Sequence, residues 1–133
     1  MDPVYVQWVE PSCPANTAKT AWTLTATGIE TVLLHRMEVR IPAGHQGLTG
    51  IALVDSGAFV IPYTTDAPGW LIGDDDELSY DYEKELGHNV KLATYNTDDT
   101  NVHAWQVRMV YTPMSVVGSE LASIEVIRAL TGS

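Results

Sequence analysis

Positive charge is scarce in this sequence. Seven Lys and Arg residues stand against 17 Asp and Glu residues, which gives a formal net charge of -10. Binding to a nucleic-acid backbone depends on Lys and Arg side chains that neutralise phosphates. The composition therefore largely excludes a nucleic-acid partner.

Cysteine is also nearly absent, because Cys13 is the only one. A single Cys cannot form an intrachain disulfide, and a zinc site would need three further ligands of other types. A disulfide-stabilised secreted scaffold is therefore excluded. Cys13 lies between Pro11 and Pro14 with no obvious base beside it in the sequence, so we expect an unreactive thiol.

Long apolar runs are missing as well. No run approaches the ~20 residues needed to cross a bilayer. The first ten residues lack the positively charged region and the apolar region of a secretory signal peptide. We therefore expect no membrane partner and a product that is soluble where it is made.

The chain does contain enough apolar material for one packed domain, since 45% of its 133 residues are hydrophobic and 18% are charged. From Thr20 onward, short alternating runs are separated by turn residues, as in antiparallel sheets. Two long runs each place five residues on one face: Leu33, His35, Met37, Val39 and Ile41, and His103, Trp105, Val107, Met109 and Tyr111. About eight such strands predict an all-β antiparallel sandwich of jelly-roll type over residues 20–113.

One hairpin is especially well marked. Residues 48–54 and 58–63 flank Asp55-Ser56-Gly57. We predict a three-residue loop in which Gly57 adopts the left-handed conformation beside a bulge.

The two ends differ from this central region. Residues 1–19 contain three prolines and predict an extended N-terminal arm, with an edge strand possible over residues 4–9. In the tail, residues 114–133, apolar residues recur at three-residue intervals after a possible N-cap at Ser119, which predicts a short amphipathic helix. Strand-like alternation at Ile124 and Val126 leaves a β-tail open. The predicted partner-binding residues are Val4, Val6 and Trp8 in the arm, and Leu121, Ile124, Ile127 and Leu130 in the tail.

Residues 74–85 carry seven carboxylates and one Lys. Clustered carboxylates suit calcium, which takes six to eight oxygen ligands, but the spacing of an EF-hand loop is absent. The favoured interpretation is a solvated acidic turn that precedes a strand, and calcium binding at Asp74-Asp75-Asp76-Glu77 is the alternative.

The remaining patterns predict no catalytic residue, no metal site and no cofactor. The four histidines form no His-x-His pair, and strand parity places His35 and His103 on apolar faces, where core histidines are usual. Only convergence of these two with a carboxylate would indicate a metal. Ser56 lacks the flanking glycines of a nucleophile elbow, and the glycines of residues 44–50 lack the Lys-Ser/Thr pair of a phosphate loop. We therefore expect a protein without enzymatic activity.

Aromatic residues suggest one alternative function. Flat rings stack on sugars, and Trp70, beside Pro68 and Gly69, is the best candidate for exposure. If Trp70 shared an exposed groove with Tyr63 or Tyr82, the chain would be a carbohydrate-binding module.

Several segments together resemble small β-sandwich virion proteins of tailed bacteriophages. They are Arg40-Ile41-Pro42-Ala43-Gly44-His45-Gln46-Gly47-Leu48-Thr49-Gly50-Ile51, Ile61-Pro62-Tyr63, Trp70-Leu71-Ile72-Gly73-Asp74-Asp75, Thr94-Tyr95-Asn96-Thr97-Asp98 and His103-Ala104-Trp105-Gln106-Val107-Arg108. The resemblance rests on loop spacing over about residues 30–112.

The resemblance implies a jelly-roll structural protein that is made in the host cytoplasm and located in the virion. Such proteins decorate the capsid, often as trimers, and dock through their termini. The expected partners are therefore the major capsid protein and further copies of the chain, with a homotrimer favoured. A carbohydrate-binding module of a phage tail or host-attachment component is the alternative.

Overall fold

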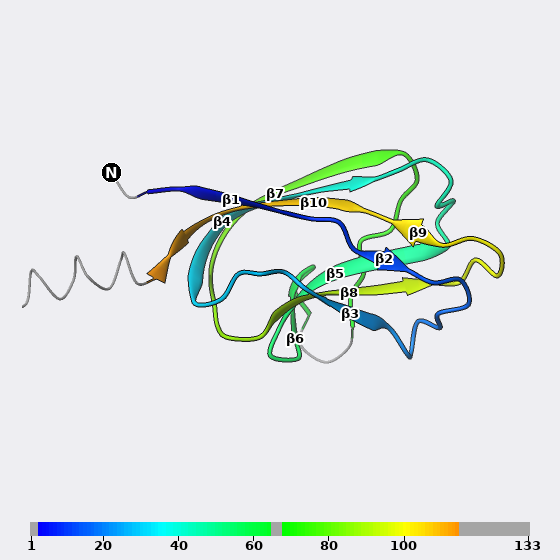
Figure 1. Ribbon diagram of the computed structural model, residues 1–133, viewed down its shortest axis with the longest axis horizontal. Helices are drawn as coiled ribbons and strands as arrows, with labels where there is room; N and C mark the ends of the chain where they lie inside the picture. Colours follow the sequence, from blue (N-terminus) through cyan, green and yellow to red (C-terminus); the bar gives the residue numbers. More distant parts are fainter. Residues whose placement is uncertain (1–2, 65–67, 115–133) are drawn as a thin grey trace, which may run out of the picture.

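A computed structural model describes residues 3–64 and 68–114 (Figure 1). The secondary structure elements of these residues are ten β-strands. They are β1 (Tyr5–Val9), β2 (Ser12–Cys13), β3 (Thr23–Ala26), β4 (Val32–Ile41), β5 (Thr49–Asp55), β6 (Ala58–Ile61), β7 (Asp76–Leu86), β8 (Val90–Asn96), β9 (His103–Ala104) and β10 (Gln106–Pro113).

Eight of these strands form two four-stranded antiparallel sheets that pack as layers (Figure 1). The first sheet has the order β1-β10-β4-β7 and the second β3-β8-β5-β6, while β2 and β9 form a separate short pair. Five of the pairings are nested along the chain: β1 with β10, β2 with β9, β3 with β8, β4 with β7, and β5 with β6. A long hairpin rolled up on itself gives this nesting, so the predicted jelly-roll sandwich is confirmed.

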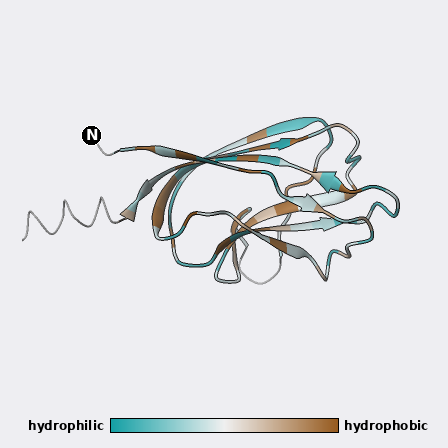
Figure 2. Cartoon of the chain, viewed as in Figure 1, coloured by the Kyte–Doolittle hydropathy of each residue, from teal (hydrophilic) through white to brown (hydrophobic). Residues whose placement is uncertain are grey.

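The core forms because alternate residues of both sheets point between the layers. β4 supplies Met37, Val39 and Ile41, and β10 supplies Val107 and Met109, all at most 1% exposed. Leu92, Leu53 and Ile51 face them from the second sheet and are fully buried. Figure 2 shows apolar stretches on the strands of both layers. The alternation that predicted the strands is therefore the pattern that fills the interior.

The predicted faces of β4 and β10 are correct over only part of each strand. In β4 a bulge between Leu34 and Arg36 shifts the register, so Leu33 and His35 are not buried with Met37. In β10 a register shift between Val110 and Tyr111 leaves Tyr111 half-buried. One extra residue in a bulge moves all later side chains to the opposite face, which explains both errors.

The predicted hairpin joins β5 and β6, but its loop is shorter than expected. Asp55 pairs with Ala58, so only Ser56 and Gly57 form the loop. Both have positive φ, 51° and 88°. Two consecutive positive φ values are typical of a type I′ turn, which matches the twist of the strands better than the predicted three-residue loop.

Residues of the predicted arm are extended and pair with the sandwich. β1 is the edge strand of the first sheet, where it pairs with β10, and β2 pairs with β9. The buried Cys13 thiol lies 3.7 Å from the Thr94 carbonyl oxygen. The edge strand expected over residues 4–9 is therefore present as β1. The predicted helix of the tail lies outside the described residues.

The position of β10 between β1 and β4 leads to a stability prediction. We expect Met109→Ala to lower the free energy of unfolding by about 2–5 kcal/mol, because it removes a fully buried side chain and leaves a cavity. Urea denaturation measures this change. Val102→Ala is the control, because Val102 is 65% exposed and should change stability by no more than about 0.5 kcal/mol. Equal effects of both substitutions would contradict the assigned core.

Candidate functional site: the outer face of the first sheet

The outer face of the β1-β10-β4-β7 sheet carries three rows of side chains that cross the strands. Register pairs give the rows Val6-Val110-Arg36-Asp81, Trp8-Arg108-Glu38-Ser79 and Gln106-Arg40-Glu77. Opposed residues of antiparallel strands share a face, so each row is a line of neighbours. We call this surface, together with Val4, the docking face.

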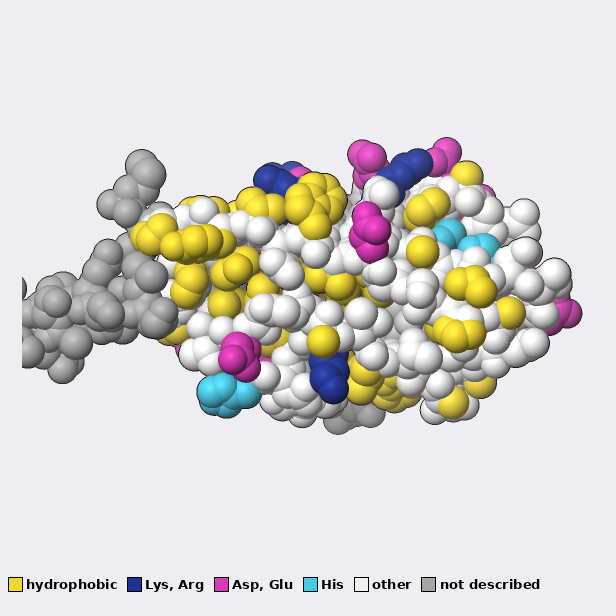
Figure 3. Space-filling view, in the orientation of Figure 1, with side chains coloured by type: hydrophobic (Ala, Val, Ile, Leu, Met, Phe, Trp, Pro, Cys, Tyr) yellow, Lys and Arg dark blue, Asp and Glu magenta, His cyan; other side chains and the backbone are white. Residues whose placement is uncertain are grey.

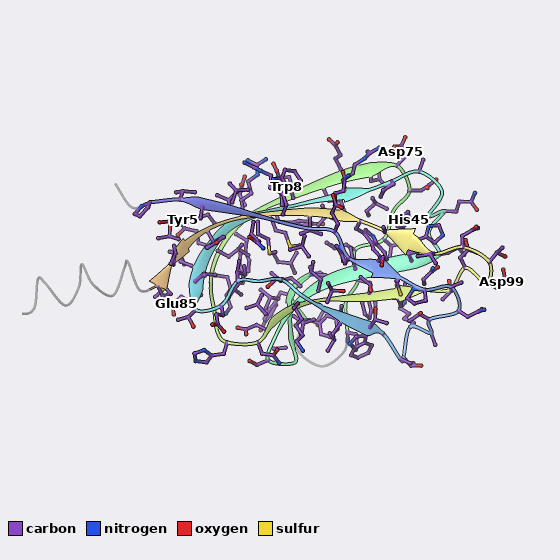
Figure 4. All side chains as sticks on the ribbon, viewed as in Figure 1. Tyr5, Trp8, His45, Asp75, Glu85 and Asp99 are labelled. Carbon is purple, nitrogen blue, oxygen red and sulfur yellow. The ribbon has the colours of Figure 1, made fainter. Side chains whose placement is uncertain are left out.

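The β1 side of the docking face is apolar. Val4, Val6 and Trp8 are 58%, 44% and 61% exposed and share one face of the strand, because they alternate along it. Tyr5 is also exposed, so four of the ten exposed large apolar side chains of the described residues lie between residues 4 and 8. Figure 3 shows apolar side chains along this edge, and Figure 4 labels Tyr5 and Trp8 on β1. The structure thus brings together the three predicted partner-binding residues of the arm.

The middle of the docking face holds an ion-pair ladder. Glu38 accepts from Arg108 at 2.8 Å and lies 2.9 Å from Arg36. Arg36 also lies 3.6 Å from Asp81. The hydrogen bond from Arg108 is the main reason why the pKa of Glu38 is lowered. Three of the seven Lys and Arg residues of the chain, Arg36, Arg40 and Arg108, therefore lie on this one face.

A hollow of about 430 Å³ lies over this ladder, with Trp8 on one side and Ser79 on the other. Its arginines already have acidic partners, so the hollow is no simple anion site. Trp, Tyr and Arg are enriched among the residues that dominate binding in protein–protein contacts, so an exposed Trp beside ordered Arg side chains makes this face a candidate for such a contact. Sequence reasoning found Trp8 but missed the arginines, because only the register between distant strands places them beside it.

His35 and His103 do not converge with a carboxylate at one point. His103 Nε2 lies 2.9 Å from Asp98 Oδ2, but the ring next to it, 4.4 Å away between centroids, belongs to His45. His35 instead contacts Thr112 and Glu83. Within residues 3–64 and 68–114, no group of three or more His, Cys, Asp or Glu side chains is arranged to hold a metal ion.

His45 is buried in a neutral form. Its Nε2 donates to the Ala104 carbonyl at 3.0 Å, and its Nδ1 accepts from the Thr49 hydroxyl at 2.7 Å. Burial, followed by the nearby His103, lowers the pKa of His45. These bonds join the residue 45–49 loop to β9, so His45 has a structural role at this end of the sandwich. The sequence did not predict this role of His45, because the glycines on either side of it, Gly44 and Gly47, indicate only a shaped loop.

The acidic segment begins with a turn whose carboxylates bind donors of the protein itself. Asp74 accepts from the Gly44 N–H at 2.8 Å, and Asp76 accepts from the Asp74 N–H at 2.9 Å. The Gln46, Gly44 and His45 backbone N–H groups lower the pKa of Asp74. Asp75 pairs with Arg40 at 2.6 Å. The geometry is therefore that of the turn interpretation rather than of a calcium loop.

The two residues of the predicted sugar-binding face lie in different places. Trp70 is half-buried on the outer side of the second sheet, in edge contacts with Trp22, Phe59 and Tyr95. Tyr63 is 68% exposed and lies in a separate groove with Tyr80 and Tyr82. The predicted tail residues Leu121, Ile124, Ile127 and Leu130 lie outside the described residues.

Comparisons with known proteins support the fold. No family model and no curated protein matches the chain. A chain of the cyanophage Pam1 capsid asymmetric unit is similar with a TM-score of 0.51 and 8% identity, over 84% of this chain and 86% of that one. A Bacillus endospore appendage structure (TM-score 0.47, 12% identity, 85% of this chain and 91% of that one covered) and the Tobacco streak virus coat protein (TM-score 0.38, 16% identity, 80% and 85% covered) are less similar in fold.

Among the described residues, no helix has the length and apolar character that a membrane crossing requires.

The buried His45 leads to a pH prediction. The unfolded chain binds a proton at His45 near pH 6.5, whereas the folded chain binds it only at lower pH. Stability should therefore fall as the pH drops below about 6.5, until the folded protein also takes up the proton. We expect His45→Gln to flatten this part of the curve of unfolding free energy, measured by urea denaturation between pH 7.5 and 5.

His88→Gln is the matched control, because His88 is exposed. It should keep the slope of the unchanged protein. A slope that His45→Gln leaves intact would show that His45 is not the group responsible.

Proposed function

We propose that this chain is a non-enzymatic structural protein of a bacteriophage particle, which forms homotrimers and decorates the capsid surface. The observation that carries the proposal is the row of exposed Val4, Val6 and Trp8 beside the arginine ladder on a jelly-roll sheet. An apolar row beside ordered arginines is a surface that suits binding to another protein. The fold similarity to a chain of the Pam1 capsid asymmetric unit supports a place in a virion.

The distribution of charged residues between the two edge strands of the first sheet indicates which edge meets the partner. β1 contains no charged residue, whereas β7 at the opposite edge contains six: Asp76, Glu77, Asp81, Glu83, Lys84 and Glu85. Charges on an edge strand prevent pairing with other chains, so β7 is protected and β1 is not. With a net charge of -10, the chain repels its copies least where acids are fewest. We therefore assign the β1 edge to contacts with the capsid protein.

The tail is the second proposed contact. The described chain ends at Met114, one residue beyond β10, and β10 pairs with β1. The tail therefore leaves the domain from the strand next to the apolar row. If residues 119–130 form the expected amphipathic helix, its stripe of Leu121, Ile124, Ile127 and Leu130 extends the same contact surface, toward the capsid or a neighbouring copy.

A non-enzymatic role is consistent with how the reactive groups are engaged. His45 and His103 bind Thr49, Ala104 and Asp98, and the Cys13 thiol is buried. The carboxylates of the hollow bind the arginines beside them. Each of these groups has a structural partner, so none is poised as an acid, base or nucleophile.

Trp8→Ala tests the docking face. We expect it to weaken binding to purified capsids that lack this protein by about tenfold or more, because central Trp residues of interfaces carry large shares of the binding energy. Co-sedimentation with capsids measures the affinity, and circular dichroism checks the fold. Val102→Ala, at a residue of similar exposure outside this face, is the control and should bind like the unchanged chain. Equal binding by all three proteins would contradict the assignment.

A truncation tests the tail in the same assay. Removing residues 119–133 should reduce capsid binding and leave the unfolding transition of the sandwich in place.

Light scattering on the full chain tests the trimer and should give three times the 14.5 kDa mass of one chain. A monomer at all concentrations would refute the trimer.

A further inference from the structure

A groove at the opposite edge of the sandwich borders the docking face only at Ser79 and Asp81. It lies between β6 and β7, edge strands of the two sheets. Val60, Ile61 and Pro62 contribute apolar surface from one side. Tyr80 and Tyr82, which alternate on β7, line the other side, and Tyr63 follows β6. Because β1 and β7 are opposite edges of the first sheet, docking through β1 leaves this groove accessible.

Three of the six tyrosines of the chain line this groove. Tyr63 and Tyr82 are 68% and 40% exposed, whereas Tyr80 is half-buried and packs against the core. The hollow measures about 610 Å³, within the range of small-molecule sites. It therefore offers aromatic surface in a concavity of ligand size.

Polar groups lie at the same place. Ser79 and Asp81 line the groove, and the Asp81 side chain is 80% exposed although it lies 3.6 Å from Arg36. Sugar rings need both kinds of surface, since their C–H faces stack on aromatic rings and their hydroxyls donate to carboxylates. The exposed Asp81 carboxylate can accept from a sugar hydroxyl in addition to its ion pair with Arg36.

The charge around the groove selects among sugars. β7 carries five carboxylates and one Lys, and Arg36 is already engaged by Glu38 and Asp81. Anionic glycans would meet repulsion there. We propose that the groove formed by Tyr63, Tyr80 and Tyr82 binds an uncharged sugar ring of a glycan, which would give the chain a binding activity separate from capsid docking.

An array of neutral, sialylated and sulfated oligosaccharides tests this inference. We expect the unchanged chain to bind at least one neutral glycan. Sialic acid or sulfate groups should not be required for binding to any glycan on the array. Titration with that glycan should show a loss of about tenfold or more for Tyr63→Ala and for Tyr82→Ala, because each removes a stacking surface. Tyr82→Phe keeps the ring and should retain most of the affinity.

Tyr5→Ala is the matched control, since Tyr5 is 47% exposed but lies on β1, away from the groove. It should bind the glycan like the unchanged chain. The inference is overturned if no neutral glycan binds, if only acidic glycans bind, or if the groove variants bind as well as Tyr5→Ala.

The capsid assay separates this inference from the proposed function. Tyr63→Ala and Tyr82→Ala should co-sediment with capsids like the unchanged chain. If they lose capsid binding and no glycan binds, the groove is part of the capsid contact and the sugar site is refuted.

Discussion

The antiparallel pairing of β1 with β10 is the constraint on which the rest of the structure depends. It joins the first and last strands of the sandwich, and the other strand pairs nest inside it. β10 also pairs with β4, so its inward side chains, Val107 and Met109, fill the core while Arg108 faces out. Because the register is fixed, Trp8 lies opposite Arg108, and Arg108 lies opposite Glu38. The same pairing therefore produces both the fold and the composition of the docking face.

The first sheet changes character from one edge to the other. It is apolar at β1, has arginine–carboxylate pairs across its centre, and is acidic at β7. This gradient leaves the first sheet with one edge, β1, that carries no charged residue. Under the proposed docking through β1, the β7 edge and the tyrosine groove remain in solvent. The two proposed activities therefore use opposite edges of one sheet.

The sequence predicted local features better than distant ones. Alternation along β4 and β10, where burial of one face imposes a period of two, and the turn residues between β5 and β6 were sufficient for the strands and the sandwich. The bulges at Leu34/Arg36 and Val110/Tyr111 left no such mark, since an extra residue changes the period only at one point.

The candidate site was predictable in part for the same reason. Val4, Val6 and Trp8 are neighbours in sequence, so their shared face followed from alternation. The arginines that complete the site come from β4 and β10, and only the strand register places them beside Trp8. Likewise, the carbohydrate-binding alternative required Trp70 to lie near Tyr63 or Tyr82, but the fold separates Trp70 from these two tyrosines.

Electron cryomicroscopy of the intact particle that contains this chain tests the central claim most directly. A reconstruction should show the jelly roll on the shell with Trp8 and the β1 edge against the capsid protein, and with the β7 edge directed toward solvent. A reconstruction in which the β1 edge faces solvent, or in which the chain is absent from the particle, would contradict the account.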